Sequence, residues 1–231
     1  MSEEIFDVVD DRDRIIGKQT RREVHRRGLK HRAVHVLVFN PRGEIFLQKR
    51  SFKKDTFPGA WDSSASGHLD SGETYDACAV REVREEIGLF LDKTPKRLFK
   101  IPACAQTGQE FVWVYRKEST GPFRLNLDEL ECGAFFKPDH VNRWMAERPR
   151  DFADAFRLIW KYLESPPKPD PKKPAKAAAK KSKGATKSVK RPKRPAPRPS
   201  TAKAMAKAMA KPTTKPRRKP ASRPAPRAKR R

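Results

Sequence analysis

The sequence has few cysteines and no long apolar run. Its 231 residues include three cysteines, Cys78, Cys104 and Cys132, with no C-x-x-C pair. An odd number of cysteines without paired spacing predicts reduced thiols rather than a disulfide framework. We interpret them as core residues in a predicted helix or strands, not as nucleophiles. No apolar stretch approaches the roughly 20 residues that a membrane-spanning helix needs.

The beginning of the sequence also lacks a signal-like segment. The stretch "MSEEIFDVVDDRDR" is acidic and contains no apolar core region, whereas a signal peptide requires one. Together with the cysteine pattern, this absence predicts a soluble cytoplasmic protein with no membrane partner. Nothing in these features predicts an oligomeric state.

Aromatic and acidic residues are nearly absent from the last part of the chain. Residues 165–231 contain 25 Lys and Arg against a single acid, Asp170, and they hold 14 of the 21 prolines. All four tryptophans lie before residue 161. A segment of this composition cannot bury enough apolar surface to offset its chain entropy. We therefore predict a globular domain over residues 1–164 and a disordered, basic Lys/Ala/Pro/Arg-rich tail over residues 165–231.

The net charge of +24 on this tail favours association with nucleic acid or another polyanion. Without aromatic residues the tail cannot stack on bases, so we expect binding without sequence preference. Two alternatives are open: a solubilising arm without a fixed partner, and an import signal in a nucleated cell.

Hydrophobic periodicity and turn residues predict an α+β fold for the first 164 residues. Alternating segments bounded by turn residues predict two hairpins and three later strands, over residues 4–20, 33–50, 97–106, 110–118 and 131–137. Helical periodicity and capping residues predict four helices, over residues 21–28, 74–88, 138–148 and 151–163. Residues 51–73 are rich in Gly, Ser, Asp and Pro and are expected to be mostly loop.

The predicted helix over residues 74–88 carries three glutamates, Glu82, Glu85 and Glu86. At about 100° per residue they occupy one arc, and an apolar stripe of Val80, Val83 and Ile87 lies on the opposite side. Like charges at this spacing repel one another. Two interpretations are open: a solvated helix face, or a site in which a divalent cation offsets the repulsion.

The segment from Gly67 to Leu89 is similar to a complete Nudix box, G-x5-E-x7-R-E-U-x-E-E-x-G-U with U aliphatic. All nine defined positions match. The resemblance implies an α/β/α sandwich with a mixed sheet, and Mg²⁺- or Mn²⁺-dependent hydrolysis of a diphosphate bond. It also implies cation ligands at the three glutamates and at the Gly67 carbonyl, and a structural pair between Glu73 and Arg81.

The sequence around the box resembles type I isopentenyl diphosphate isomerases, which share the Nudix fold but move a double bond. Those enzymes use a cysteine where this chain has Ser66, and they keep only the last of the three glutamates, whereas Glu82 and Glu85 are both present here. A serine hydroxyl is too weak an acid to replace the thiol. We therefore interpret the chain as a hydrolase from an isomerase-like branch.

Other residues match functional positions of those isomerases. The resemblance implies metal binding at His31, His68 and Glu110, with His25 one residue away from another such position, and it implies diphosphate contacts from Arg50 and Lys54. We predict Glu82 and Glu85 of the box, together with Glu110, as catalytic residues. We also predict His68 as a metal ligand. The alternative for both His68 and Glu110 is a solvated side chain that binds no ligand. We interpret His25 and His35 as surface or core-edge histidines, and Trp61 as a packing residue.

Two functional classes therefore compete. The first is a Nudix-type pyrophosphohydrolase acting on a nucleoside diphosphate linked to another group, or on a similar diphosphate compound. The second is a nucleic-acid-associated module with a catalytically weak Nudix domain, and isomerase activity is a less favoured alternative. The group attached to the diphosphate is open, because selectivity depends on loops outside the box.

Overall fold

The computed structural model describes residues 3–165 of the chain. The basic tail falls outside these residues, apart from Ser165, so its predicted disorder and polyanion binding stay predictions. Within the described part, no helix has the length and apolar character needed to cross a membrane.

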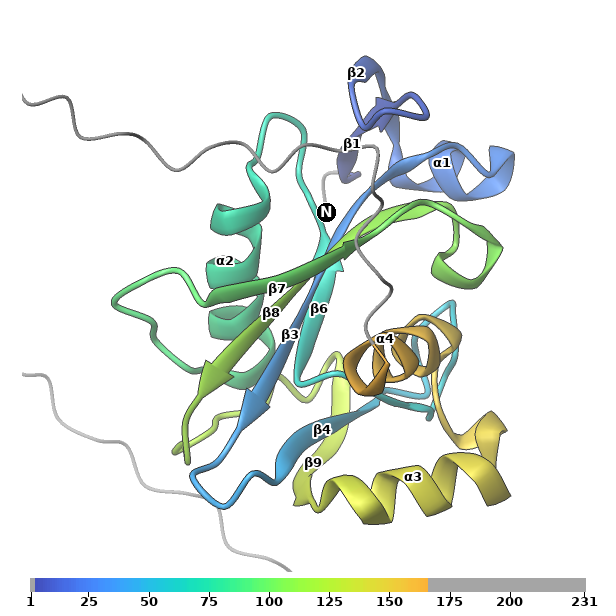
Figure 1. Cartoon of the computed structure of the whole chain (residues 1–231). Helices are drawn as coiled ribbons and strands as arrows, with labels where there is room; N and C mark the ends of the chain where they lie inside the picture. The colour runs from blue at the N-terminus through green and yellow to red at the C-terminus, as the bar shows by residue number, and fades with distance from the viewer. Residues whose placement is uncertain (1–2, 166–231) are drawn as a thin grey trace, which may run out of the picture. The chain divides into compact units, whose positions relative to one another are not determined.

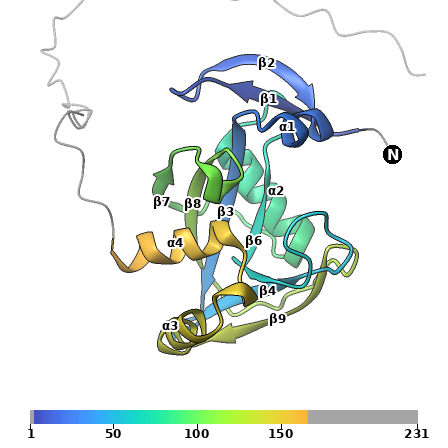
Figure 2. The ribbon, with the colours of Figure 1, turned by 90° about the vertical axis from the view of Figure 1, so that its right-hand side faces the viewer.

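The described chain begins with a hairpin and a short helix, both at the predicted positions. Strands β1 (Ile5–Val9) and β2 (Ile15–Thr20) pair in antiparallel fashion, and α1 (Arg21–Arg27) follows directly. The Thr20 hydroxyl accepts a hydrogen bond from the Glu23 amide, which caps the helix start. Figure 2 shows this unit at one end of the described part, beside the beginning of the central strand β3.

The main sheet of the described residues has seven strands arranged around β3 (Figure 1). Strand β3 is parallel to β8 and antiparallel to its other partners, so the sheet is mixed, as expected. The order is β5-β4-β3-β8-β7, with β6 also paired to β3 and β9 to β4. The strands are β3 (His31–Phe39), β4 (Ile45–Arg50), β5 (Trp61–Asp62), β6 (Ala65–His68), β7 (Lys96–Ile101), β8 (Glu110–Glu118) and β9 (Leu130–Phe136).

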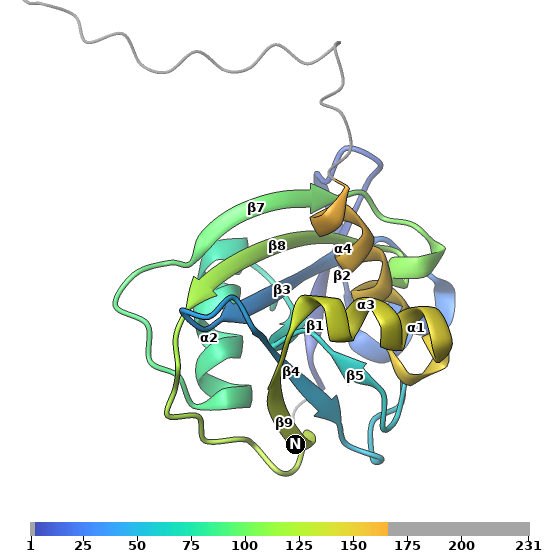
Figure 3. The same cartoon turned by 60° about the horizontal axis from the view of Figure 1, so that its bottom comes forward.

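Helices cover both faces of this sheet (Figure 3), which confirms the α/β/α arrangement. Helix α2 (Tyr75–Ile87) packs on one face, and α3 (Pro138–Glu147) and α4 (Asp154–Glu164) pack on the other. The alternation along β3 explains this layering, because successive side chains point to opposite faces. Val34, Val36 and Val38 contact the α2 side, whereas Ala33, Leu37 and Phe39 contact the α3/α4 side.

Residues 51–73 are mostly loop, as predicted, but they also contain two short strands, β5 and β6, that the sequence pattern did not indicate. Strand β6 pairs with β3 in the register Val34↔Gly67 and His35↔Ser66, although "ASGH" offers little apolar alternation. Further along, β3 pairs with β4 instead. The sheet therefore divides beside β6, and side chains of α2 enter at this division.

The cysteines form no disulfide in the described residues. Cys78 is buried in α2, which agrees with a core residue. Cys104 is half-buried outside the strands, and Cys132 is exposed on β9. The core interpretation was therefore wrong for these two. Trp61 packs edge-on against Phe136 and Trp144, as predicted for a packing residue.

Candidate functional site

A cavity of about 280 Å³ lies where the sheet divides beside β6. Its lining comes mainly from α2, β3, β6, the loop after β4 and the start of β8, with further residues from α1, β1, β5, the turn before β8 and the beginning of α4. Eight of the predicted site residues line this cavity, namely Arg50, Lys54, Gly67, His68, Glu82, Glu85, Glu86 and Glu110, whereas His31, which the isomerase resemblance also implied, is not part of the lining. Segments that are far apart in the sequence thus form one site.

The glutamates of α2 reach the cavity past a glycine of β6. A Cβ atom added to Gly67 would lie 2.0 Å from Oε1 of Glu82, so only glycine leaves room for that carboxylate. Two donors fix the neighbouring Glu86: the Ser66 amide lies 2.8 Å from its Oε2 atom, and Nε2 of Gln48 lies 3.0 Å from the same atom. Oε2 of Glu86 is therefore occupied by protein donors.

The predicted orientation of α2 was partly wrong. Glu82 and Glu86 are 8 % and 3 % exposed, and only Glu85 is exposed. The buried face of the helix continues from Val83 and Ile87 through Cys78 and Ala79 to these two glutamates, while Val80 lies at its edge. Glu82 and Glu86 therefore lie beside the apolar stripe, against β6, and not on the opposite side.

Burial has an electrostatic consequence for this carboxylate cluster (Glu82, Glu85 and Glu86). Burial raises the pKa of Glu82 well above its usual value, and the neighbouring Glu86 raises it further. Burial also raises the pKa of Glu86, with a smaller contribution from Glu129. The site therefore stabilises the charged forms of these two carboxylates less well than water does.

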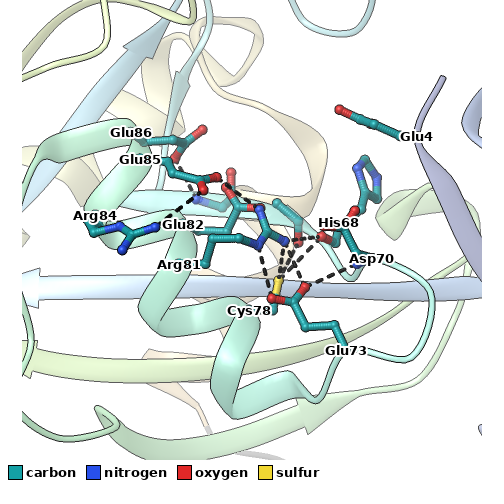
Figure 4. A network of polar contacts seen from close by, with 12 residues as sticks. Glu4, His68, Asp70, Glu73, Cys78, Arg81, Glu82, Arg84, Glu85 and Glu86 are labelled. Atoms are coloured by element: carbon teal, nitrogen blue, oxygen red, sulfur yellow. Dashed lines mark hydrogen bonds and ion pairs between the residues drawn. The ribbon is translucent and has the colours of Figure 1, made fainter. Parts of the chain in front are cut away.

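Arg81 offsets part of the repulsion (Figure 4). Its Nε and Nη2 atoms bind the two oxygens of Glu73 at 3.0 and 2.8 Å. Its Nη1 atom lies 2.7 Å from Oε1 of Glu82 and 3.1 Å from Oε2 of Glu85, and Nη2 also donates to the His68 carbonyl. One guanidinium group thus holds the loop after β6 on the helix and partly neutralises the carboxylate cluster.

Three histidines form a second group at the other side of the cavity. The ligand atoms of His25, His31 and His68 all lie within 4.8 Å of one another, and the Phe6 ring stacks on His31 and His68. Nε2 of His31 is buried and has no hydrogen-bond partner in the described structure. We call these residues the histidine cluster. A buried nitrogen without a hydrogen-bond partner, beside two other imidazole rings, offers nitrogen ligands that suit a transition-metal cation.

Glu110 begins β8 and contacts the histidine cluster. Its Oε1 atom lies 2.9 Å from Nε2 of His68 and 3.6 Å from Nε2 of His31. Burial alone would raise the pKa of Glu110, but the His31 and His68 rings outweigh burial and hold that pKa well below its ordinary value. The side chain is therefore a firmly ionised carboxylate.

The two predicted phosphate-binding residues already have partners. Nη1 of Arg50 lies 3.4 Å from Oδ2 of Asp62, and its Nε donates to the Thr56 carbonyl at 3.1 Å. Nζ of Lys54 lies 2.8 Å from Oε2 of Glu129. Both side chains border the cavity, so their remaining donors are available to an anionic ligand.

Sequence reasoning missed several residues of this site, among them Gln48 and His35. Gln48 is fully buried and orients Glu86. His35 is buried, as expected of a core-edge residue, but it also lines the cavity. The contacts of both residues depend on strand pairs distant in sequence. The only local signal was a histidine within the otherwise apolar strand "AVHVLVF".

Comparisons with known proteins identify the family to which this fold is similar. Residues 29–156 match the family model of the NUDIX domain. A Nudix hydrolase of Deinococcus radiodurans is 31 % identical over 160 residues, which cover 69 % of this chain and 94 % of that protein. A Nostoc Nudix hydrolase, so far uncharacterised, is 40 % identical over 159 residues, covering 68 % and 94 %. A solved structure of a D. radiodurans protein superposes with a TM-score of 0.62 at 28 % identity, covering 68 % of this chain and 98 % of that one.

Proposed function

The chain belongs to the Nudix family of hydrolases, which cleave diphosphate bonds and generally use divalent metal ions, and we propose a specific form of that activity for it. The substrate is a nucleoside diphosphate linked to another group, or a similar diphosphate compound. The cofactor is Mg²⁺ or Mn²⁺, held by the carboxylate cluster and the Gly67 carbonyl.

The observation that carries this proposal is the pair of buried carboxylates beside Gly67. Glu82 and Glu86 are almost fully buried with raised pKa values, and Arg81 is the cation that contacts Glu82. Carboxylate and carbonyl oxygens are the ligands that hard divalent cations prefer, so the donor set fits. When bound, such a cation neutralises charge that develops on the diphosphate and lowers the pKa of a water.

The other residues of the cavity have complementary roles in this proposal. Arg50 and Lys54 bind the oxygens of the diphosphate, since both present positive charge at the cavity wall. His68 and Glu110, with the rest of the histidine cluster, hold a second cation, and the unpaired Nε2 of His31 supports this role. Glu110 serves as a ligand of this cation.

We favour hydrolysis over isomerisation for two reasons. Ser66 stands where the resembling isomerases have their catalytic cysteine, and Glu82 and Glu85 add two carboxylates that those enzymes lack.

For residues 165–231 we propose binding to nucleic acid without sequence preference, supported by their charge of +24. A protein ending at Leu163 should keep its hydrolase rate and lose most of its DNA and RNA affinity. For the full chain, log K should fall by about 0.9 per log unit of salt for each phosphate contacted on duplex DNA. Tight binding by the shortened protein, or strong discrimination between sequences by the full chain, would contradict this role.

The decisive experiment measures release of phosphate or nucleoside monophosphate by the full chain. Substrates are nucleoside diphosphate derivatives, dinucleotides, capped RNA and prenyl diphosphates, each with and without Mg²⁺. We expect Mg²⁺-dependent turnover of at least one compound, and loss of turnover in Glu85→Gln. No turnover of any compound, with nucleic-acid binding intact, would favour the alternative of a binding module with a catalytically weak Nudix domain.

A further inference from the structure

His35 lies inside the cavity although it belongs to the central strand of the sheet. Alternation along β3 places it on the same face as Ala33 and Leu37, away from α2. Its neighbour across the pair with β6 is Ser66. The residue is only 4 % exposed, yet it lines the cavity together with the carboxylate cluster and Glu110. A polar ring at this position needs a specific partner or a specific role.

One nitrogen of the His35 ring is anchored by the segment after β5. Nδ1 lies 2.7 Å from the Ser63 hydroxyl oxygen and 3.7 Å from Oδ1 of Asp62. The Ser63 hydroxyl is also 3.3 Å from Oδ1 of Asp62. Because this hydroxyl can donate its proton to the carboxylate, or to the Ala65 carbonyl at 3.4 Å, its oxygen can accept a hydrogen bond from Nδ1–H of the histidine. The carboxylate nearby favours the same tautomer.

Asp62 is itself held in place. The Ser63 amide donates to its Oδ1 atom at 2.7 Å, and Nη1 of Arg50 lies 3.4 Å from its Oδ2 atom. Asp62, Ser63 and His35 therefore form an ordered chain of polar contacts. It fixes the ring orientation and leaves the lone pair on Nε2.

That second nitrogen is free. Nε2 of His35 bonds to none of the residues between 3 and 165. Nε2 of His31 is fully buried without a hydrogen-bond partner, whereas Nε2 of His35 is not fully buried. A neutral imidazole with an accessible acceptor nitrogen is the usual form of a general base.

Charged groups around the ring keep it in this form. Burial lowers the pKa of His35; Asp62 on β5 and Glu110 on β8 raise it, and Arg50 on β4 lowers it, with a net value below the ordinary one. The ring is therefore neutral at neutral pH. Glu110 is less suited to accept a proton, because the His31 and His68 rings stabilise its ionised form.

We propose that His35 is the proton acceptor for the water that attacks the diphosphate, with Ser63 and Asp62 as positioning residues. This role rests on the proposed hydrolase function. As the water oxygen bonds to phosphorus, Nε2 takes one of its protons. The bond from phosphorus to the leaving oxygen breaks with its electron pair on that oxygen. The proton then passes from Nε2 to the leaving group or to solvent, so no other reactant is needed.

The test compares His35→Asn with His140→Asn in the full chain, using whichever compound of the panel the wild type cleaves fastest. Asn can still donate to Ser63 but has no acceptor at the Nε2 position, whereas His140 is exposed on α3. For His35→Asn we expect kcat to fall about 100-fold or more with KM unchanged, and the acidic limb of the kcat/KM profile to disappear. His140→Asn should keep the wild-type profile.

Two positioning variants extend the test. Asp62→Asn should move the acidic limb to lower pH, because the lost carboxylate had raised the pKa of His35. Ser63→Ala, which removes a single hydroxyl, should lower kcat at unchanged KM even if His35→Asn does not fold. An acidic limb that persists in His35→Asn, or wild-type kcat in that variant or in Ser63→Ala, would overturn the proposal.

A measurement without substrate separates this proposal from the proposed function. Nitrogen chemical shifts of the histidines in the ¹⁵N-labelled full chain report the tautomer and protonation of each ring. At neutral pH we expect His35 to be neutral with its proton on Nδ1. A proton on Nε2, or a charged ring, would overturn the role of His35 even if the enzyme is active. If the wild type cleaves no compound while the expected tautomer is observed, the hydrolase function fails instead.

Discussion

Replacing Glu86 by Gln should stabilise the metal-free protein at alkaline pH while removing a cation ligand. The side chain is 3 % exposed, and its Oε2 atom accepts hydrogen bonds from Gln48 and Ser66. An amide oxygen can accept the same two bonds without a charge. The substitution therefore preserves the local contacts and removes only the buried negative charge.

The sign and size follow from the raised pKa of Glu86, whose principal cause is burial. The folded protein retains a proton that the unfolded chain releases above its usual pKa near 4.5. The free energy of unfolding therefore decreases as pH rises from that value through the raised pKa. Each pKa unit corresponds to about 1.4 kcal/mol, so we expect Glu86→Gln to gain about 1 to 3 kcal/mol over wild type near pH 8.

The assay is urea unfolding of both proteins near pH 5 and near pH 8, with a chelator and with excess Mg²⁺. The difference should be small near pH 5, where wild-type Glu86 is protonated. Mg²⁺ should stabilise the wild type near pH 8 and stabilise the variant much less, because only the wild type offers the full carboxylate cluster. A variant less stable than wild type near pH 8 in chelator, or equally stabilised by Mg²⁺, would refute this reasoning.

Three further substitutions probe the same cavity. Gly67→Ala should weaken Mn²⁺ binding, measured by electron paramagnetic resonance, because its Cβ would meet Glu82 at 2.0 Å. Gly17→Ala is the control, because no atom lies within 4 Å of the new Cβ there. Equal Mn²⁺ affinities of the two variants would contradict the expected role of Gly67. Gln48→Leu should lower Mn²⁺ affinity about tenfold or more, and unchanged affinity would argue against its orienting role. Wild type should not isomerise isopentenyl diphosphate, and Ser66→Cys alone should not gain full isomerase activity, since Glu82 and Glu85 also differ from those enzymes; dimethylallyl diphosphate above the enzyme-free control in wild type would contradict this prediction.

The local features of the fold were predictable because they depend on neighbouring residues. Thr74 and Gly88 mark the ends of α2, as capping residues should: the Thr74 hydroxyl accepts from the Ala77 amide, and Gly88 adopts a left-handed conformation. The hairpin around β3 and β4 was predicted for the same reason. Its strands are strongly apolar and a turn separates them.

Features that depend on distant contacts were not predictable from the sequence pattern. Helical spacing leaves Glu86 only about 60° from Val83, but a charged residue normally faces solvent, so the burial of Glu82 and Glu86 was not expected. In the structure these glutamates are buried because Gly67, on a strand that the sequence did not reveal, leaves room for Glu82. The contact between His35 and Ser63 likewise joins residues 28 positions apart.

The position of bound Mn²⁺, located by anomalous scattering in crystals of the full chain, decides whether the carboxylate cluster is the cation site. We predict a peak among the carboxylates of Glu82, Glu85 and Glu86, within bonding distance of the Gly67 carbonyl. Mn²⁺ bound elsewhere, with no peak beside these three glutamates, would contradict that prediction.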